Sequence, residues 1–470
     1  MDEFLREIHT LIFKEWILIQ EQKNYQIHLD DKNDNIIIIE TDYSYSQITF
    51  NPLSIIELSV MNTTNQEIEF YLHFQMKTMK HAIELFYEMI ESIQQLVEKP
   101  KVRILLSCSG GLTTSYFASK LSEASELLFL NYEVKAIGYN ELFNVGHDYD
   151  VIILAPQISY MHAKAQEIFK NQIVIKIPPH IFAKYDVAQT LHLIEAALKN
   201  NHSKKSEHES EPPSLQTTIH NDTKILVLSI FRNSLRVHIA YRIYDEHNHI
   251  LLDNEIIKPK MTIQDIFDII DTSILHYPDI RMVGVSTPGI INDGYVVSAN
   301  VDGLEDMDLL SILSSRYKQI RFILSNDVNT AAVGYYASQK QYNSLSFLFQ
   351  PTNHFSGAGT IVNGQLIRGR AHLAGEVQYL PMCLSDDYLS LAKTPEGALE
   401  LSTKIILSII SIISPQAIVL CCVLIPDINE LKKELRNYLP EDFIPDIIKV
   451  DILQEYTLLG QLILCIQGDD

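Results

Sequence analysis

The stretch KVRILLSCSGGLTTSYFASKL, residues 101–121, decides the fold of one part of this chain. Its residues 102–107 are an apolar run typical of a buried strand, and Cys108 stands at the carboxyl end of that run. Two glycines occupy the short loop 109–111, and a helical pattern begins at residue 113. The stretch therefore predicts a strand, a tight loop and a helix N-terminus, with a cysteine where the strand meets the loop.

Such a loop is suited to holding a phosphate. Its glycines let backbone N–H groups converge, and the helix dipole favours negative charge at the helix N-terminus. A thiol placed there is a candidate nucleophile. Two other readings remain open: Cys108 is an inert buried thiol, or it belongs to a phosphatase. A cysteine phosphatase loop needs an arginine six residues after the cysteine to hold the phosphate, and that position is Thr114. A phosphoryl carrier fits this loop better than an esterase.

The residues that follow alternate between strand and helix. Residues 150–155 and 173–177 read as strands, while helices are expected from Ala163 and over 189–198. This alternation predicts a parallel sheet with flanking helices.

Two motifs in this region resemble the lactose/cellobiose-type IIB component of the bacterial phosphotransferase system. They are Cys-Ser-Gly-Gly-Leu-Thr-Thr-Ser at 108–115 and Ala-Pro-Gln-Ile-Ser-Tyr-Met at 155–161. The resemblance covers about 101–198 and implies a four-stranded parallel-sheet domain. It implies that Cys108 accepts a phosphoryl group from a phosphohistidine on a IIA protein. It also implies that the phosphate is held by Ser109, Gly110, Gly111, Thr113, Thr114 and Ser115, with Pro156 and Gln157 shaping the facing loop.

The regions on either side of this domain differ in character. Residues 199–223 are polar, contain a Pro-Pro pair and have few large apolar side chains, which predicts a flexible linker. Residues 1–97 carry several strand patterns and then a helical pattern from Lys77 to Glu98, which predicts a small α+β domain. No chemistry can be read from that domain.

The second half, 224–470, again alternates strands and helices, and Asn363-Gly364 is a strong hairpin signal. Its motifs resemble the ROK family of sugar kinases and sugar-responsive repressors, which implies an actin-like duplicated α/β fold. The motifs that carry this resemblance are Gly284 to Gly289, Asn326-Asp327-Val328-Asn329, Gly357-Ala358-Gly359, Asn363-Gly364, Ala374-Gly375-Glu376 and the passage from Ser414-Pro415 to Leu420.

The ROK resemblance implies a sugar site. Asp327 matches the base that takes a proton from the sugar hydroxyl, and Asn326 and Glu376 match sugar contacts. The simpler reading of Asn326 and Asp327 is capping of the helix that begins at Val328. The simpler reading of Glu376 is a solvated surface acid.

The chain departs from the ROK pattern where ATP and zinc bind. The first phosphate loop is replaced by 229–234, which has no glycine, and the second by 353–355. Phosphoryl transfer depends on close backbone approach to the phosphates. The family's zinc-ligating histidine falls at Tyr379, and its cysteine cluster is reduced to Cys383. We therefore expect neither ATP chemistry nor a metal, and Asp327 would then be vestigial as a base.

The composition excludes some classes of partner and some cellular environments. The chain has 37 Lys and Arg against 59 Asp and Glu, a formal charge of −22, and no Lys/Arg-rich run, which argues against nucleic-acid binding. Five scattered cysteines indicate reduced thiols in a cytosol. The apolar stretch 405–425 is interrupted at Ser414-Pro415, which favours a buried helix and strand over a membrane span.

Taken together, these patterns predict a cytoplasmic α/β multidomain protein of the phosphotransferase system. Cys108 is expected to take phosphate from a IIA-type protein, and the ROK half is expected to bind a sugar or sugar phosphate as a regulator or accessory subunit. A IIC transporter or a regulator is a further candidate partner, and homo-oligomers are expected through the ROK domain. The alternatives are a working IIB transport subunit, a ROK-type sugar kinase, and a transcriptional regulator. Whether the chain is an enzyme stays open.

Overall fold

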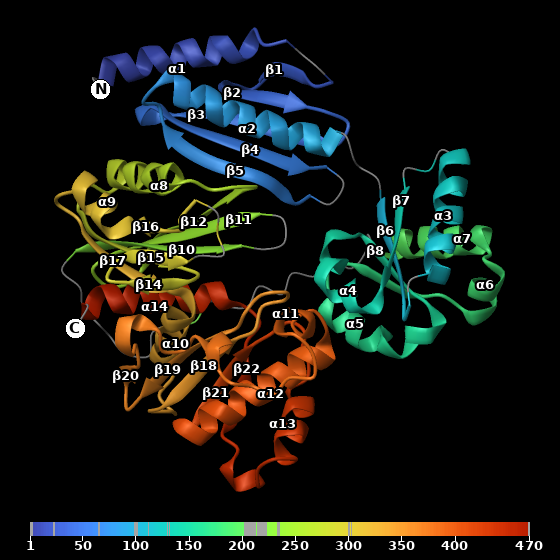
Figure 1. Ribbon diagram of the computed structural model, residues 1–470. Helices are drawn as coiled ribbons and strands as arrows, with labels where there is room; N and C mark the ends of the chain where they lie inside the picture. The colour runs from blue at the N-terminus through green and yellow to red at the C-terminus, as the bar shows by residue number, and fades with distance from the viewer. Residues whose placement is uncertain are drawn as a thin grey trace. The chain divides into compact units, whose positions relative to one another are not determined.

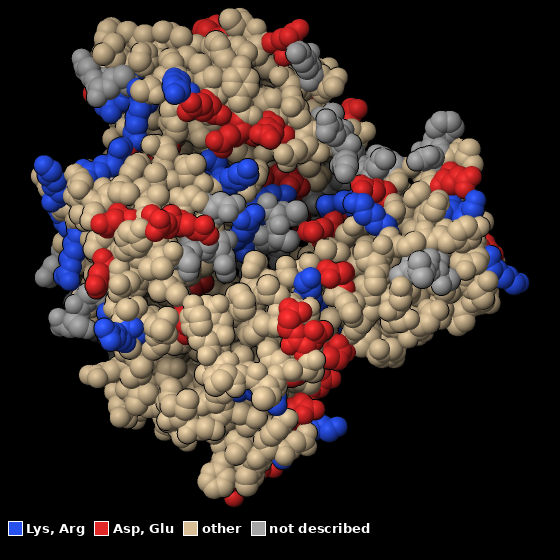
Figure 2. All heavy atoms as spheres, in the orientation of Figure 1, with Lys and Arg blue, Asp and Glu red and all other residues tan. Residues whose placement is uncertain are grey.

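The computed structural model describes most of the chain (Figure 1), and Figure 2 shows the charged side chains of the same face. The described residues are 3–21, 24–63, 66–97, 102–110, 112–128, 130, 132–201, 213, 223–232, 236–298, 301 and 303–468. They divide into two compact units, the first drawn from 1–100, 217–330 and 457–470, and the second from 101–216 and 331–456. Most of the predicted linker 199–223 lies outside the described residues, although the helix before it continues to Asn201.

The second unit contains the domain built around the quoted stretch. Its sheet has four parallel strands in the order β7-β6-β8-β9, which are Tyr132–Gly138, Val102–Cys108, Val151–Leu154 and Ile173–Lys176. The expected four-stranded parallel sheet is confirmed. Strand β7 had not been located from the sequence, because its half-buried residues lack a continuous apolar run.

Helices cover both faces of this sheet. The odd and even residues of β6 point to opposite sides, so Ile104 and Leu106 pack with one helix layer and Leu105 packs with the other. The first layer contains α3 (Leu112–Leu127) and α7 (Val187–Asn201), and the second contains α4 (Tyr139–Val145) and α5 (His162–Ile168). The remaining short helices are η2 (Gly146–Asp148), η3 (Pro156–Met161) and α6 (Pro179–Lys184).

The same unit contains one lobe of the C-terminal half. Its five-stranded sheet has the order β20-β19-β18-β21-β22, which are Gln365–Leu366, Gly357–Val362, Leu345–Phe349, Ala417–Cys421 and Asp446–Lys449. Strands β19 and β20 form the expected hairpin. Asn363 and Gly364 both have positive φ, at 52° and 80°, as a tight two-residue turn requires.

The apolar stretch 405–425 folds as expected into a helix and a strand. Helix α12 (Pro395–Ile412) ends just before Ser414, which has a φ of +51°, and β21 follows at Ala417. Within the part of the chain that the structure describes, no helix has the length and apolar character needed to cross a bilayer. Helices α11 (Tyr388–Leu391) and α13 (Ile428–Arg436) complete the helices beside this sheet.

The four-stranded domain packs against this lobe through its α4–α5 layer. One hydrophobic core joins Phe143, Ile168 and Phe169 of the domain to Leu424 and Leu431 of the lobe. The polar contacts that cross the same surface include Lys164 Nζ to Glu430 Oε2 at 2.8 Å, Lys393 Nζ to Glu141 Oε1 at 3.1 Å, and Tyr139 Oη to Glu396 Oε2 at 2.8 Å. The domain is therefore part of the second unit and not a separate body tethered to it.

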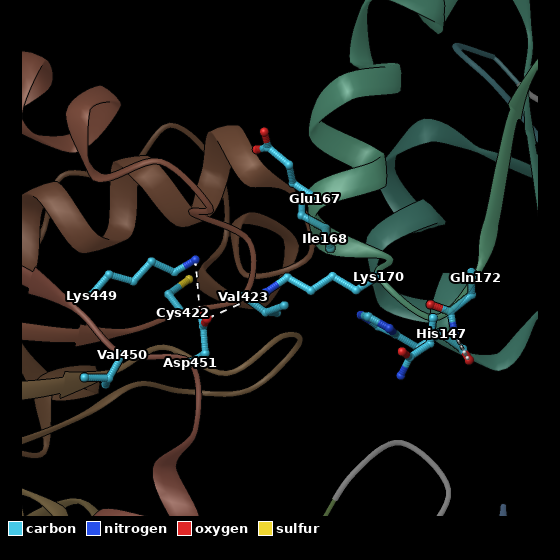
Figure 3. A pocket seen from close by; sticks show the side chains of 11 residues that line it. His147, Glu167, Ile168, Lys170, Gln172, Cys422, Val423, Lys449, Val450 and Asp451 are labelled. Carbon is cyan, nitrogen blue, oxygen red and sulfur yellow. Dashed lines mark hydrogen bonds and ion pairs between the residues drawn. The ribbon is translucent and has the colours of Figure 1, made fainter. Parts of the chain in front are cut away.

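A cavity of about 250 Å³ lies where the domain meets the carboxyl ends of β21 and β22 (Figure 3). Lys170 of the domain and Lys449 of the lobe both approach Asp451, at 3.6 Å and 3.2 Å. Ligands of parallel sheets commonly bind at the carboxyl ends of the strands. Here that edge is bordered by side chains of the four-stranded domain, including His147 and Gln172.

The first unit is built on a ten-stranded sheet. Its order is β1-β2-β3-β4-β5-β12-β11-β10-β13-β17. The strands are β1 (Gln26–Asp30), β2 (Asn33–Glu40), β3 (Ser44–Asn51), β4 (Ile55–Asn62), β5 (Ile68–Gln75), β10 (Lys224–Arg232), β11 (Val237–Tyr244), β12 (Ile250–Lys258), β13 (Ile280–Thr287) and β17 (Arg321–Asn326). The N-terminal region thus extends the sheet of the other lobe of the C-terminal half.

The helices of this unit are α1 (Glu3–Leu18), α2 (Met79–Val97), α8 (Ile263–His276), α9 (Leu309–Arg316) and most of α14 (Leu453–Gln467). Helices α1 and α2 pack together over the N-terminal strands, where Phe13, Trp16 and Phe86 form an aromatic cluster. Helix α10 (Asp327–Ala337) crosses the boundary between the units. A small sheet, β14-β15-β16, comprises Ile290–Asn292, Tyr295–Ser298 and Met307–Asp308.

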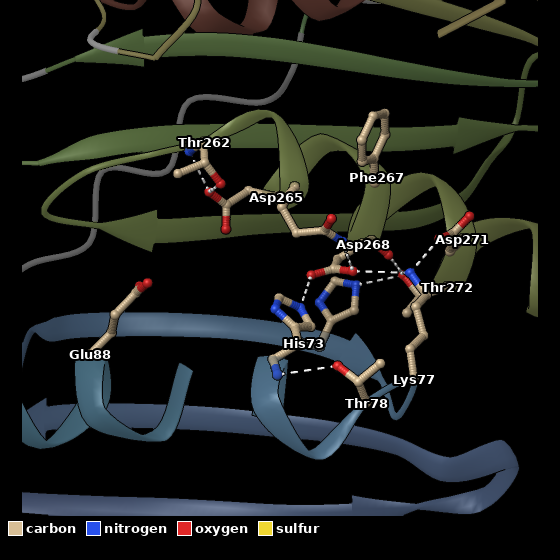
Figure 4. A network of polar contacts seen from close by, with 12 residues as sticks. His73, Lys77, Thr78, Glu88, Thr262, Asp265, Phe267, Asp268, Asp271 and Thr272 are labelled. Carbon is tan, nitrogen blue, oxygen red and sulfur yellow. Dashed lines mark hydrogen bonds and ion pairs between the residues drawn. The ribbon is translucent and has the colours of Figure 1, made fainter. Parts of the chain in front are cut away.

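A buried polar network connects the N-terminal part to the rest of the first unit (Figure 4). Strand β5 pairs with β12 at Tyr71 and Ile257, and α8 packs beside β5. Asp268 of α8 accepts hydrogen bonds from Lys77 and from His81, the latter at 2.8 Å. Burial alone would raise the pKa of Asp268, but the hydrogen bond from His81 and the charge of Lys77 lower it below its usual value. The Asp268 carboxylate is therefore held ionised where the N-terminal part contacts α8.

His73 of β5 lies beside this network and makes the stability of the first unit depend on pH. Its Nε2 lies 2.9 Å from Thr272 Oγ1, Tyr241 packs against its ring, and the side chain is nearly inaccessible. Burial lowers the pKa of His73 to about 4; Asp268 opposes this shift and His276 adds to it. The unfolded chain therefore binds a proton at a higher pH than the folded chain, and stability is lost as the pH falls from the ordinary histidine range towards 4.

We expect the free energy of unfolding to fall by about 2 kcal/mol between about pH 7.5 and about pH 5 because of this histidine. Urea unfolding at the two pH values measures the change. His73→Gln should remove most of the difference, whereas exposed His249→Gln should leave it intact. An equal fall in wild type and His73→Gln would contradict this assignment.

Candidate functional site

Cys108 ends β6 and faces the α3–α7 layer of the four-stranded domain. Its side chain is 5% exposed, and its Sγ lies 3.1 Å from the Thr114 hydroxyl in the first turn of α3. Thr114 stands six residues after the cysteine in the sequence, which is the spacing at which a cysteine phosphatase loop needs its arginine. The thiol therefore sits beside a neutral hydrogen-bonding group, which can contact a phosphate without neutralising its charge.

The loop after Cys108 is open to solvent. Ser109 and Gly110 are exposed, and a Cβ built on Gly110 would meet no atom within 4 Å. Ser115 is exposed in the first turns of α3. Gly111 lies outside the described residues, as does the side chain of Thr113. The described residues that follow the buried thiol, Ser109 and Gly110, are thus at the surface of the domain.

The facing loop is the short helix η3 that follows β8. The N–H of Ala155 donates to Ser107 O at 2.9 Å, which sets the start of η3 beside the end of β6. Pro156 is half-buried at its first position and Gln157 is exposed. Tyr160, 74% exposed on the same helix, is a further surface residue near this end that the motif reading had not assigned. The structure thus brings Cys108, Thr114 and the Pro156 loop to one edge of the sheet.

Asn326 and Asp327 lie at the junction of β17 and α10. Asn326 Nδ2 donates to Gly289 O at 2.8 Å, and its Oδ1 accepts from the N–H of Asn329 at 3.0 Å. Asp327 is 7% exposed, and its Oδ1 accepts from the N–H of Val328. The capping contacts expected of a helix start are present. They also fix the two side chains at the carboxyl end of β17, next to the Gly289 turn.

Glu376 lies in the second unit, directly after a glycine whose φ is positive. Gly375 has a φ of +95°, and its carbonyl accepts from the N–H of Ala358 at 2.9 Å. Burial raises the pKa of Glu376, partly offset by a hydrogen bond from Gln378. Glu376 is therefore half-buried and not a fully solvated acid. The three residues matched to sugar contacts belong to two different units, Asn326 and Asp327 to the first and Glu376 to the second.

In the segment matched to the second phosphate loop, 353–355, one backbone amide has a partner within the lobe, and so does the amide that directly follows the segment. The N–H of Asn353 donates to Ala392 O at 3.0 Å, and the N–H of Ser356 donates to the Tyr388 hydroxyl at 3.1 Å. Phe355 packs on the Tyr388 ring at a centroid distance of 5.1 Å. These amides already have partners within the lobe. For the first phosphate loop, Ser229 to Arg232 are strand residues of β10, and 233–235 lie outside the described residues.

The cysteines of the C-terminal half do not gather into a metal site. Cys421 and Cys422 are buried, and burial raises the pKa of their thiols to about 12 and about 11. Cys383 and Tyr379 are exposed. Among the residues that the structure describes, no group of three or more His, Cys, Asp or Glu side chains is placed to hold a metal ion. That the protein binds no zinc remains a prediction.

Comparison with known proteins identifies both halves. Residues 103–192 match the family described as PTS system, Lactose/Cellobiose specific IIB subunit, and residues 236–388 match the ROK family. The chain therefore carries a IIB domain and a ROK domain, as their motifs indicated.

Individual relatives agree with these matches. A xylose repressor of Caldicellulosiruptor bescii is 28% identical over 163 residues, which cover 33% of this chain and 40% of the repressor. An oligo-beta-mannoside-specific EIIB component of Bacillus subtilis is 28% identical over 65 residues, which cover 14% of this chain and 63% of the component. The chain thus matches less than two thirds of the length of either relative.

Two solved structures resemble the two halves separately. A ROK family protein of Streptococcus pneumoniae in complex with sucrose has 18% identity and a TM-score of 0.43, with 52% of this chain and 98% of that chain covered. A lactose-specific IIB component domain of Streptococcus pneumoniae has 20% identity and a TM-score of 0.19, with 21% and 97% covered.

Proposed function

We propose that this chain, which joins a lactose/cellobiose-type IIB domain to a ROK domain, is a cytoplasmic phosphotransferase-system protein that accepts a phosphoryl group on Cys108. The observation that carries the proposal is the placement of the Cys108 thiol at the end of β6, 3.1 Å from the Thr114 hydroxyl and directly before the exposed residues Ser109 and Gly110. IIB domains receive phosphate from IIA proteins, so the donor is a phosphohistidine on a IIA-type protein. The S–P bond forms as the N–P bond breaks, and the proton lost by the thiol is balanced by a proton taken up on the imidazole nitrogen that leaves phosphorus.

The second part of the proposal is that the ROK domain binds a sugar. ROK domains bind sugars, and Asn326, Asp327 and Glu376 are the residues we assign to the sugar or sugar phosphate. We infer that this half does not use ATP. The amides of Asn353 and Ser356 are already hydrogen-bonded, β10 carries no glycine where a phosphate loop is needed, and IIB side chains border the carboxyl ends of β21 and β22.

The protein then acts as a sugar-responsive regulator or accessory subunit whose state depends on Cys108. The similarity to a xylose repressor favours a regulatory role for the ROK half as a second candidate, without assigning DNA to this chain. A working IIB subunit is distinguished from a regulator by whether phosphate leaves Cys108 for a sugar.

Intact mass spectrometry tests the first half of the proposal. The full chain is incubated with phosphoenolpyruvate, the general phosphotransferase proteins and a lactose/cellobiose-type IIA protein. We expect a phosphate-sized mass gain in wild type and in Cys383→Ser, and none in Cys108→Ser, because Cys383 is exposed but has no such loop. Thr114→Val should slow the gain by about tenfold, since one hydrogen bond to the phosphate is lost. No gain with several IIA proteins, or a gain that survives Cys108→Ser, would refute the relay.

Calorimetric titration tests the second half. A panel of monosaccharides, disaccharides and their phosphates is titrated into the full chain with and without magnesium ATP. We expect binding of at least one sugar that Asp327→Asn weakens, no heat from ATP, and no sugar phosphorylation in a coupled assay. Phosphorylation of a sugar from ATP would overturn the inference that the lobe is inactive towards ATP.

A further inference from the structure

A pocket of about 570 Å³ lies in the first unit, where the N-terminal part meets the lobe of the ROK domain that contains α8. Its walls are formed by α1, the end of β5 with the residues after it, α8, and the residue that follows α9. Its volume is in the range usual for sites that bind small molecules. None of its lining residues belongs to the Cys108 loop or to the residues assigned to the sugar. They are Arg6, Gln75, Lys77, Asp271, Ile274 and Tyr317.

Arg6 brings to this pocket a positive charge that no carboxylate of the described residues neutralises. Its Nη1 donates to Gln75 Oε1 at 3.2 Å, which is its side-chain contact within the described parts of the chain. Gln75 is 7% exposed, and its own Nε2 donates to Leu53 O at 3.1 Å, so its amide oxygen is fixed towards the arginine. A guanidinium has five N–H donors. Arg6 is therefore held in position by a neutral, buried group and keeps donors for a ligand.

The acidic residue of the pocket, Asp271, is already paired with cations. Its Oδ1 accepts from the Tyr317 hydroxyl at 2.7 Å. Its Oδ2 accepts from Arg316 Nη2 at 3.0 Å and from Lys77 Nζ. Lys77 also contacts the neighbouring carboxylate of Asp268 at 3.2 Å (Figure 4). The negative charge of Asp271 is thus balanced within the protein and does not repel an anion as an unpaired carboxylate would.

The charges around the pocket leave an excess of positive charge. Arg6, Lys77 and Arg316 carry three positive charges against the two carboxylates, so one positive charge remains. The Lys77 ammonium uses two of its three N–H donors on these carboxylates and has one left. A phosphate group offers three oxygens, so two can meet the planar fork of Arg6 while the third meets Lys77. A carboxylate, with two oxygens, satisfies the fork alone.

We propose that this pocket binds the phosphate group of a small phosphorylated molecule, with Arg6 as its main contact and Lys77 as the second. The uncharged part of the ligand lies against half-buried Ile274 and the ring of Tyr317. Arg6 belongs to α1, whereas Ile274 belongs to α8. The ligand therefore connects the N-terminal helix to the ROK domain, and its binding holds the first turns of α1 in place.

Equilibrium dialysis of the full chain with labelled inorganic phosphate and labelled glycerol phosphate tests the proposal. We expect binding that Arg6→Gln weakens by about tenfold or more, because hydrogen bonds to a charged group are lost. Arg6→Lys keeps the charge without the fork and should bind with intermediate affinity. Lys80→Gln is the matched control, since it removes an equal charge from an exposed position on α2 and should leave the affinity unchanged.

Amide hydrogen exchange locates the site. With glycerol phosphate present, we expect slower exchange in the first turns of α1 and just after β5 in wild type and Lys80→Gln, and no slowing in Arg6→Gln. Urea unfolding without ligand should give Arg6→Gln the midpoint of wild type; if it does not, Arg6→Lys decides the comparison. Equal affinity of wild type and the Arg6 variants would overturn the site, as would slowing confined to 108–115. No binding of either probe at millimolar concentrations, the weak end of small-molecule affinity, would also overturn it. Acetate that binds as tightly as phosphate would overturn the assignment to a phosphate group.

Discussion

Gly375→Ala is expected to destabilise the chain by about 3 kcal/mol or more and to abolish the proposed sugar binding. Gly375 has a φ of +95°, where side chains are rarely tolerated, and a Cβ there would lie 1.8 Å from the carbonyl oxygen of Ala358. That oxygen belongs to the backbone of β19, so it cannot move aside as a side chain does. The loop must shift, and Glu376, which follows directly, must shift with it. Urea unfolding and sugar titration of the same preparation measure both effects.

Gly364→Ala separates backbone strain from the close contact. Gly364 has a similar φ of +80°, but the nearest atom to a Cβ there is the Tyr336 hydroxyl at 3.0 Å, which is the end of a side chain and not backbone. We expect a loss of about 1 kcal/mol and unchanged sugar affinity. If the two alanine variants lose equal stability, the close approach to Ala358 is not what makes Gly375 necessary.

Lys258→Met is expected to cost about 3–5 kcal/mol, because it removes the cation from a buried ion pair and leaves a carboxylate behind. Lys258 ends β12 and is 2% exposed, with Asp265 Oδ1 at 2.7 Å and Glu88 Oε2 at 2.9 Å. Burial alone would lower the pKa of Lys258, but the two carboxylates outweigh it and raise the pKa. Glu88 lies on α2, so this lysine also connects the N-terminal part to α8.

Two variants test whether the loss of stability comes from the unpaired carboxylate of Asp265. Lys80→Met removes an exposed lysine that pairs with Glu84 at 3.7 Å, and its stability should match wild type. Adding Asp265→Asn to Lys258→Met should recover part of the loss, because the remaining buried group is then neutral. A double variant as unstable as the sum of the two single variants would point to lost packing.

The IIB domain was the part most readily predicted, because its signals are local. The run from Val102 to Cys108, the glycine loop and the following helix start all lie within about twenty residues of each other. The hairpin at Asn363-Gly364 and the helix stop near Ser414 likewise follow from the conformations that single residues favour. The placement of Cys108 beside Thr114 also follows, since both residues belong to the same short loop and helix.

The contacts between distant segments were not predictable in this way. The N-terminal region was read as a separate domain, and nothing in the sequence of β5 indicates that it pairs with β12. The alternation of apolar and polar side chains along a strand is the same whether the strand lies at the edge of a sheet or inside it. The packing of α5 on the ROK lobe was missed for a similar reason. Ile168 and Phe169 are apolar and pack in a core shared with the lobe, but an apolar side chain does not indicate which segment it will pack against. The residues matched to sugar contacts were proposed from motifs alone, and Asn326 and Glu376 belong to different units, so their assignment stays a prediction.

The pairing of β5 with β12 also constrains how the chain is made. Strand β5 is complete at Gln75, yet its partner edge ends at Lys258, about 180 residues later, with the whole IIB domain synthesised in between. At a translation rate of about 5–20 residues per second, the nascent β5 edge waits on the order of ten to forty seconds for its neighbour. During that interval an unpaired strand is open to pairing with other chains. Synthesis on the ribosome is therefore the stage at which this protein is most exposed to misassembly, and chaperone demand should be greatest before β12 emerges.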